Sequence, residues 1–462
     1  MSLPQDIWLH IASFIPPLQL EDLYSVNHIL FNLAMDQRYQ QISLSYLTRK
    51  TVRIMERIRD PVIAERVRIL YLHPHFVKEV LQKDSSPSNS TILSRLGDFA
   101  YHIRDQRLFG RYRSRSPLFR FKTFDEFSLF MANTLSSLPN LVDLHVAWSG
   151  LPTIADSPVP IISSAFGPNL RRLWLELSLE KLGLMLPKFS CLPDLEELDL
   201  FLRIDHELDP KHYDNILIRF ARIVNSLHRT LRKFAIQLWE PIDLSPFFSS
   251  LRRLRGLETI SLSIPVGNPH LGDPDAVTDF LNLHSASLRS LTIRASELGE
   301  WGLTGTSHLS NWFQTTFTPV RLLRLTSLEI SLKLIPLESA MICIHKFAGT
   351  LRSLVLTGRH LTFHDVETVT SAFPSCRRRL ESVRLGSVTL NPQLFDMLAE
   401  KLPLLNKLEL SVREVVPCEG DYPLYYKNGL DRHDQDESQL VSFYYRPPRR
   451  KSESIAHADE VL

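Results

Sequence analysis

Histidine pairs and carboxylates are the residues of this chain with the means to do chemistry, as metal ligands or as acids and bases. His73 and His75 flank a proline, and His206 and His212 lie six residues apart. A structural zinc site takes four nitrogen, sulfur or oxygen ligands and a catalytic site takes three. No third ligand stands near His73 and His75, and His206 and His212 lie on either side of a connection that contains a proline. A turn is the more frequent setting for such pairs, so we predict no metal site.

The familiar motifs of catalysis are missing from the sequence. It contains no H-E-x-x-H, no G-x-S-x-G, no glycine-rich phosphate loop and no kinase signature, and it has only 16 glycines. Carboxylates are frequent, but no pair stands in a context that would raise a pKa. We therefore expect a protein that is not an enzyme and that needs no cofactor.

The cysteines and the charge balance restrict the compartment and the partners. Cys191, Cys343, Cys376 and Cys418 lie far apart without C-x-x-C spacing, which favours a reducing compartment over a disulfide framework. The formal net charge is only +2, which argues against nucleic acid or an anionic membrane as a partner of the whole protein. No apolar run is long enough for a membrane span, and the N-terminus lacks a basic leader. The expected location is the cytoplasm or the nucleus.

One basic stretch, from Arg104 to Lys122, has aromatic residues between its arginines. Such interleaving can bind single-stranded nucleic acid, and arginine also pairs with phosphate groups on protein partners. Most charge runs, however, are solvated faces. The sequence leaves all three alternatives open, favours a solvated insertion, and does not lead us to expect a nucleic-acid partner.

The spacing of apolar residues at the N-terminus predicts helices. Pro4 suits the first turn of a helix, and Ile7, Ile11, Phe14 and Ile15 then recur on one helical face. Two prolines end this helix, and a second begins with Leu20, Leu23 and Val26. So short a segment cannot enclose a core of its own. Its apolar faces therefore need another surface to pack against.

The order of these residues between Leu3 and Leu44 resembles the F-box motif. Leu-Pro, Ile-x-x-x-Ile, Ser-Phe-Ile-Pro and Leu-x-x-Leu-x-x-Val follow one another. The chain departs from the motif at residues 29–31, Ile-Leu-Phe, where many members carry Trp. An F-box is a short three-helix module that docks on the small adaptor subunit of a cullin-RING (SCF) ubiquitin ligase. The resemblance implies adaptor-binding anchors among Leu3, Pro4, Ile7, Ile11, Phe14, Ile15, Leu20, Leu23 and Val26. Some of these must hold the module's own helices together, and the sequence does not say which.

A leucine motif repeats through the middle of the chain. The pattern L-x-x-L-x-L, with other aliphatic residues or Phe at its later positions, recurs at a mean spacing of about 29 residues. An earlier copy stands at Val67-Leu70-Leu72, and no clear copy follows it until residue 135. The first leucines of the clear copies are Leu141, Leu170, Leu195, Leu231, Leu257, Leu288, Leu325, Leu351, Leu380 and Leu405.

This period is that of leucine-rich repeats, which form α/β solenoids. Each unit is a strand with a helical or irregular return, and the parallel strands line the concave side of a horseshoe. Helical returns are expected at 215–224, 276–283 and 394–402 from their apolar spacing. The Asn or Cys that usually closes the strand turn is absent. The alternative is an ordinary α/β domain with leucine-rich strands.

Alternation along each strand indicates which side chains face outward into the concave groove. Aromatic and acidic residues dominate these positions in the first half of the repeats, and small polar residues in the second. Exposed Trp, Tyr and Arg dominate binding energies at interfaces, although such rings can also pack on a neighbouring repeat. The predicted target-binding residues are Tyr71, His145, Trp148, Trp174, Asp199, Phe201, Trp239 and Arg294.

The predicted organisation is an F-box at 1–45, then a linker helix, irregular repeat and basic insertion at 46–134. The solenoid follows at 135–415, and a partly disordered tail at 416–462. We expect a substrate-recognition subunit of an SCF-type E3 ubiquitin ligase, with the adaptor, and through it the cullin, on the F-box and an unknown target on the repeats. The alternative is a non-catalytic leucine-rich-repeat scaffold whose N-terminal helices cap the solenoid.

Overall fold

The computed structural model describes residues 3–45, 49–73, 124–148, 158–204, 210–296, 306–373, 380–415 and 439–443. The chain divides into two compact units. Unit 1 comprises Met1–Glu240 and Leu244–Leu257, and unit 2 comprises Pro241–Asp243 and Glu258–Leu462. The basic stretch at 104–122, His75, His206, Cys376, Cys418 and most of the predicted tail lie outside the described residues.

Unit 1 begins with short helices and continues as a sheet in which each strand pairs in parallel with the next. Its strands are β1 (Gln41–Leu44), β2 (Ile69–Leu72), β3 (Asp143–Ala147), β4 (Arg172–Ser178), β5 (Glu197–Arg203) and β6 (Lys233–Leu238). The helices before β2 are α1 (Gln5–Ser13), α2 (Pro17–Leu20), η1 (Glu21–Leu23), α3 (His28–Tyr39), α4 (Arg49–Arg57) and α5 (Pro61–Ala64). Those after β2 are α8 (Phe124–Ser136), α9 (Pro158–Ser164), α10 (Leu179–Met185), η3 (Leu186–Cys191), α11 (Pro210–Ser226) and α12 (Ser245–Ser250).

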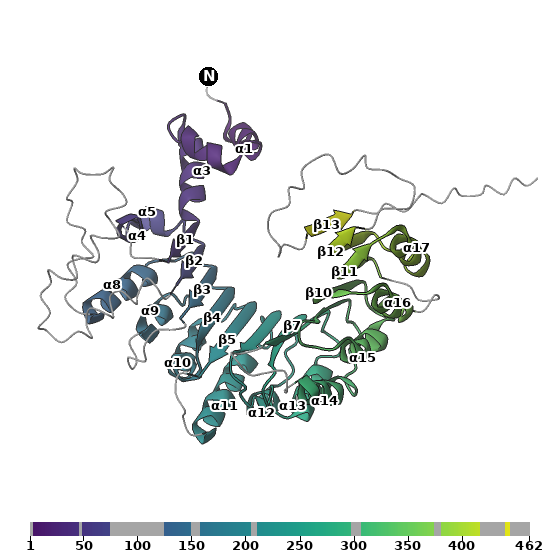
Figure 1. The fold of residues 1–462 in the computed structure, drawn as a ribbon. Coiled ribbons are helices and arrows are strands. Elements are labelled where there is room, and N and C mark those ends of the chain that lie inside the picture. Colours follow the sequence, from purple (N-terminus) through teal and green to yellow (C-terminus); the bar gives the residue numbers. More distant parts are fainter. Residues whose placement is uncertain are drawn as a thin grey trace, which may run out of the picture. The chain divides into compact units, whose positions relative to one another are not determined.

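The leucines of the repeated motif form the core of unit 1. Leu144 lies in register with Leu173, and Leu173 with Leu198, so equivalent leucines stack from strand to strand and all three are buried. Helices α8, α9, α10 and α11 lie along one face of this sheet (Figure 1). Because side chains alternate across a strand, the residues between the leucines face the opposite side. The predicted parallel α/β repeat is therefore confirmed in this unit.

The sheet begins one strand earlier than the sequence analysis predicted. Strand β1 lies inside the segment that resembles an F-box and pairs with β2, with Ile42 and Leu44 buried. The earlier copy of the leucine motif is β2 itself, and β2 pairs directly with β3. No strand is therefore inserted between them, although about seventy residues separate the two strands in sequence.

Asparagines placed before the repeat leucines connect consecutive repeats. Asn140 donates its side-chain amide to the Glu65 carbonyl at 2.8 Å, and Asn169 does the same to the Pro139 carbonyl at 2.8 Å. Each of them satisfies a backbone carbonyl that would otherwise lack a partner at a repeat boundary. The sequence analysis missed these residues because it looked for an asparagine after the strand rather than before it.

Unit 2 repeats the same architecture. Its strands β7 (Thr259–Pro265), β8 (Ser290–Ser296), β9 (Ser327–Ser331), β10 (Ser353–Leu361), β11 (Ser382–Leu390) and β12 (Lys407–Val415) are parallel, and β13 (Gln439–Phe443) pairs antiparallel with β12. Its helices are α13 (Pro274–Leu283), α14 (Thr306–Phe317), α15 (Leu337–Phe347), α16 (Phe363–Ser371) and α17 (Pro392–Lys401). The helical returns predicted at 215–224, 276–283 and 394–402 correspond to α11, α13 and α17.

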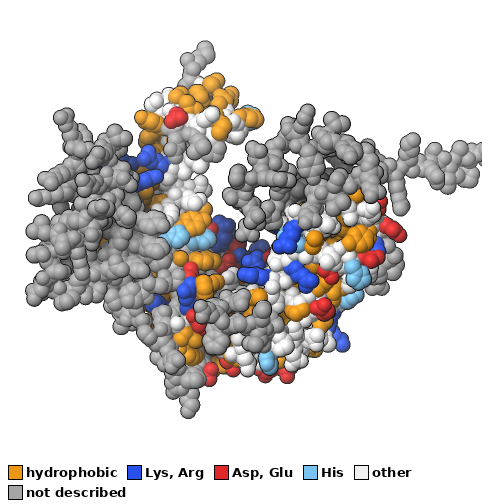
Figure 2. Space-filling model, in the orientation of Figure 1, with side chains coloured by type: hydrophobic (Ala, Val, Ile, Leu, Met, Phe, Trp, Pro, Cys, Tyr) orange, Lys and Arg blue, Asp and Glu red, His pale blue; other side chains and the backbone are white. Residues whose placement is uncertain are grey.

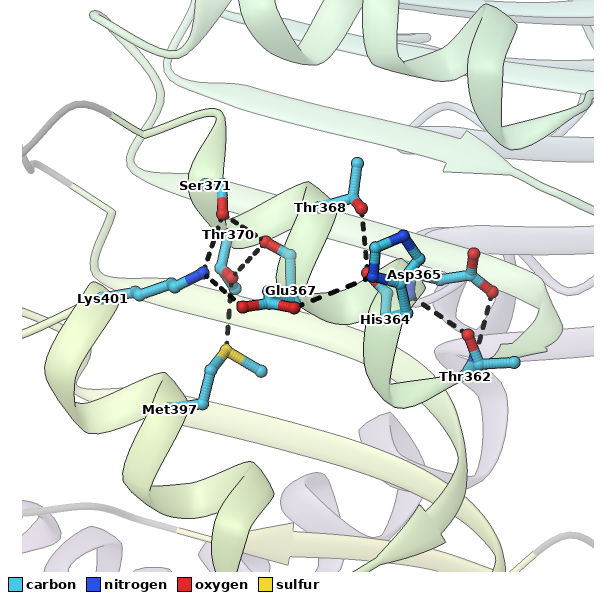
Figure 3. Close-up of polar contacts among 9 residues, drawn as sticks. All are labelled: Thr362, His364, Asp365, Glu367, Thr368, Thr370, Ser371, Met397 and Lys401. Atoms are coloured by element: carbon cyan, nitrogen blue, oxygen red, sulfur yellow. Dashed lines mark hydrogen bonds and ion pairs between the residues drawn. The ribbon is translucent and has the colours of Figure 1, made fainter.

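Side chains at both ends of α16 hold this helix in place (Figure 3). Thr362 caps its N-terminus by accepting from the Asp365 backbone N–H, and the Asp365 carboxylate accepts from the Thr362 backbone N–H in return. Lys401 of α17 reaches Glu367 at 3.3 Å and the Ser371 hydroxyl at 2.8 Å. Such reciprocal caps fix a helix end that has no intrahelical partners.

Candidate protein-interaction surfaces

Helix α1 has an apolar face that nothing in the described chain covers. None of its nine residues is buried. Ile7 is 44% exposed, Ile11 37% and Phe14, directly after the helix, 75%. Figure 2 shows apolar side chains gathered over the N-terminal helices. An exposed cluster of large apolar side chains of this kind marks an interaction site in a soluble protein.

The structure divides the nine predicted adaptor-binding residues into two sets. Leu20 is buried within the N-terminal helices, and Ile15 and Leu23 are half-buried, so these three hold the helices together. The remaining residues are exposed, namely Leu3, Pro4, Ile7, Ile11, Phe14 and Val26.

Sequence reasoning missed three further exposed apolar residues in the N-terminal segment. Tyr24 is 58% exposed, Phe31 42% and Leu9 40%. Tyr24 and Phe31 line a pocket of about 240 Å³ together with Met35 and Arg38 of α3. Their spacing offered no signal, because Leu9 and Phe31 fall outside the apolar stripe that predicted the helices.

Helix α3, in contrast, is anchored to the repeats. Asn27 caps it by accepting from two backbone N–H groups at 3.0 and 2.8 Å. Arg66, which precedes β2, forms an ion pair with Asp36 and donates to the Asn32 side chain at 2.9 Å. Arg57 of α4 donates to the Tyr39 hydroxyl at 2.9 Å. Helix α3 is therefore tied to α4 and to the residue that precedes the repeat strand β2, and α1 takes no part in these contacts.

Aromatic side chains form a row on the face of the unit 1 sheet opposite the buried leucines, which we call the outer face. Tyr71, His145 and Trp174 occupy equivalent positions on β2, β3 and β4. The Tyr71 and His145 rings stack with centroids 4.5 Å apart, and the His145 and Trp174 centroids lie 6.2 Å apart. Asp143, two residues before His145 on β3, fixes the His145 ring. Its carboxylate lies 2.9 Å from His145 Nε2 and 3.1 Å from Arg172 Nε.

A second cluster stands at the ends of β5 and β6. The Arg203 guanidinium lies 3.8 Å from the centroid of the Trp239 ring, and Phe201 meets this ring edge-on at 5.0 Å. Arg203 also pairs with Glu176 at 3.1 Å. Nε of Arg203 and Nε1 of Trp239 are buried and have no hydrogen-bond partner among the described residues. Unpaired buried donors are costly, and the Arg203 guanidinium is stabilised here by the Trp239 ring and by Glu176.

Asp199 belongs to a charge network between these clusters. Lys233 Nζ lies 2.8 Å from Asp199 and 3.6 Å from Glu197. Burial of Lys233 works against its charge, but the hydrogen bond and the charges of the two carboxylates outweigh it and raise the pKa of Lys233. The other carboxylate oxygen of Asp199 is buried without a partner in the described part of the chain.

Trp148 corrects the sequence analysis. It was predicted to line the groove, but its side chain is only 1% exposed and belongs to the core. Trp148 follows the end of β3, where its backbone N–H donates to the Glu176 carbonyl at 2.6 Å. Trp148 lies two residues after Val146 and four after Leu144, which are also buried, so alternation along β3 continues to this residue and places it in the core.

The outer face of unit 2 is different in character. Small polar residues dominate it, and its charged residues form ion pairs between neighbouring strands and along β12. Arg294 reaches Glu329 at 2.7 Å, and Glu409 lies 2.5 Å from Lys407 and 3.6 Å from Arg384. The hydrogen bond from Lys407, helped by both positive charges, lowers the pKa of Glu409. Arg294, predicted to bind a target, is thus engaged with its own neighbour.

No group of three or more His, Cys, Asp and Glu residues within the described ranges is arranged to hold a metal ion.

Cys343 lies fully buried in α15, and burial raises the pKa of its thiol far above the ordinary value, so the thiol stays protonated. Among the residues that the structure describes, no helix is long and apolar enough to cross a membrane.

Comparison with known proteins adds little to this geometry. No protein-family model matches the chain, and no curated protein matches it in sequence. A leucine-rich-repeat-containing protein of Legionella pneumophila, LegL7, is similar in structure at 12% identity and a TM-score of 0.38, covering 81% of this chain and 91% of its own. A Bacteroides fragilis protein matches at 11% identity and a TM-score of 0.28, covering 48% and 66%. The fold assignment therefore rests on the strands and helices of the chain itself.

Proposed function

We propose that this protein is the substrate-recognition subunit of an SCF-type cullin-RING ubiquitin ligase. The N-terminal helices dock on the adaptor subunit, and the outer face of the repeat sheet binds a target protein. The protein itself carries out no chemistry. Holding the target near the ubiquitin-transfer enzyme raises its effective concentration there, which is sufficient for the role.

The observation that carries the proposal is the uncovered apolar face of α1. A helix of nine residues with no buried side chain has little to stabilise it alone. Covering Ile7, Ile11 and Phe14 by a partner would remove their apolar surface from water at roughly 25 cal/mol per Å². The resemblance of the same residues to the F-box motif supports an SCF adaptor as that partner.

The target is assigned to the aromatic face of unit 1. Tyr71, His145, Trp174, Phe201 and Trp239 offer rings that are neither fully buried nor fully exposed. Half-buried aromatic residues beside arginine are typical of binding hot spots. The Arg203 guanidinium, 3.8 Å from the centroid of the Trp239 ring, would add a positive charge to the apolar area of such an interface.

The alternative is a repeat scaffold with no ligase role, in which the N-terminal helices are a cap. The anchoring of α3 through Arg66 and Arg57 favours capping by α3. It does not account for α1, since α1 leaves its own apolar face exposed. The two alternatives therefore differ in what they require of α1.

Capture of the purified adaptor subunit by the full chain separates them. Replacing Ile11→Asp together with Phe14→Asp should abolish capture, because two charges would be buried at the interface without partners. Leu129→Asp on α8 is the matched control, since Leu129 is 64% exposed and lies away from α1. Undiminished capture by the double variant, with circular dichroism unchanged, would reject the ligase role.

A further inference from the structure

A basic pocket lies at the edge of the unit 1 sheet, and it shares Arg38 with the smaller pocket of Tyr24 and Phe31. Its volume is about 720 Å³, and it is bounded by the end of α3, strand β1 and helix α4. Its lining residues include Gln41, Ser43 and Ser45 along the strand and the four cations Arg38, Lys50, Arg53 and Arg57. No acidic residue is among the described residues that line it.

Three of the four cations of this pocket lie on one face of α4. Arg53 and Arg57 are one helical turn apart on α4, and Lys50 precedes Arg53 by three residues, so all three share a helix face. The Tyr39 hydroxyl holds the Arg57 guanidinium at 2.9 Å. No ion pair within the described ranges neutralises Arg38, Lys50, Arg53 or Arg57, although most charges on the sheet face are paired. The pocket is therefore suited to a negatively charged ligand.

The strand beside these cations has a free edge. Carbonyls of Gln40 and Leu44 accept from Ile69 and His73 N–H groups at 2.9 and 3.1 Å, so the even-numbered residues of this stretch face β2. The peptide groups of Gln41, Ser43 and Ser45 consequently point to the opposite side, into the pocket. No strand in the described part of the chain pairs with that side of β1. An edge of this kind is a template for an added strand.

We propose that this pocket binds an extended acidic segment of a partner protein, added as a strand beside β1. Main-chain hydrogen bonds to Gln41, Ser43 and Ser45 would fix the segment in register. Its Asp or Glu side chains would pair with Lys50, Arg53 and Arg57. This site goes beyond adaptor docking, because it uses neither α1 nor the aromatic sheet face, and it can hold whether or not the ligase role does.

The charge requirement is tested with the full chain and a fluorescent ten-residue peptide of alternating acidic and β-branched residues, by anisotropy. Lys50→Glu with Arg53→Glu should weaken binding at least about tenfold, because attraction becomes repulsion. Arg219→Glu with Arg222→Glu on α11 makes the same change in net charge at exposed positions away from the pocket, and should change affinity less than about twofold. Equal losses in both variants would reduce the effect to net charge and overturn the proposal.

The strand requirement is tested from both sides of the interface. Ser43→Pro removes the outward N–H and should abolish binding, while Ser43→Val keeps that N–H and should retain it. If Ser43→Pro disturbs the fold, the unchanged protein can be tested with a peptide whose backbone N–H groups are methylated along one edge. This peptide cannot donate hydrogen bonds to β1 along that edge and should bind weakly. Tight binding of that methylated peptide, or of a single-stranded oligonucleotide of equal charge in its place, would show a site for polyanions in general and contradict the proposal.

Discussion

Helices α1 and α15 are similar in length and apolar content, yet they differ in how much of their surface is buried. Of the eleven residues of α15, seven are buried against its neighbours in unit 2. None of the nine residues of α1 is buried. Apolar residues at helical spacing therefore predict that a helix face will be covered. They do not predict whether the same chain or a partner covers it. In α15 the chain itself covers the face, and in α1 we assign the covering to a partner.

Truncation of a phenylalanine in a covered helix and of one at the end of α1 should show the largest contrast. Phe220 on α11 is completely buried and stacks on Phe247 at 5.1 Å, so Phe220→Ala should lower the free energy of unfolding by about 3–5 kcal/mol. Phe14→Ala should change it by less than about 0.5 kcal/mol, because Phe14 is already in water. Urea unfolding of the two variants measures both values. A comparable loss from Phe14→Ala would mean that the chain covers α1 after all.

Helix capping should give a smaller effect. Thr362→Ala removes the hydroxyl that accepts from the Asp365 N–H and should cost unit 2 about 1 kcal/mol, seen as a lower unfolding midpoint. Helix α1 has no side-chain cap to lose, since Pro4 precedes it. Thr362→Ser keeps the hydroxyl and serves as the control. If it destabilised the protein as much as Thr362→Ala, the cap would not be the cause.

The outer face of unit 2 should show the smallest effect. Because the pKa of Glu409 is lowered in the folded chain, its contribution to stability is present above the ordinary value of 4.5 and is lost as the pH falls through the lowered value. Glu409→Gln should therefore lower the free energy of unfolding by less than about 1 kcal/mol at pH 7. The difference in the free energy of unfolding between the unchanged protein and the Glu409→Gln variant should shrink as the solution is acidified below pH 4.5. A gap that is constant with pH would exclude the ion pairs as its source.

The repeats could be predicted from the sequence because each leucine position recurs at a steady period, so many weak matches support one another. Strand β1 was missed because Ile42 and Leu44 alone do not make a leucine motif. Trp148 was misplaced because it was counted among the outward residues, although it follows the buried Leu144 and Val146 at the same spacing of two. The division of the N-terminal residues into Leu20 inside and Phe14 outside needed coordinates, since one helical spacing fits both.

The basic pocket escaped the sequence analysis for a different reason. Its cations come from α3 and α4, and neither helix contains a charge run long enough to notice. Only the fold brings Arg38 and Arg53 beside the open edge of β1. The stretch between Arg104 and Lys122, which the sequence made conspicuous, stays a prediction.

Hydrogen exchange of the full chain, with and without the purified adaptor subunit, tests the central claim most directly. Amide protection reports which backbone segments a partner stabilises. We predict that the adaptor slows exchange in α1 and η1 and leaves the repeat strands unchanged. Unchanged exchange in α1 at saturating adaptor, or protection confined to the repeats, would contradict the account.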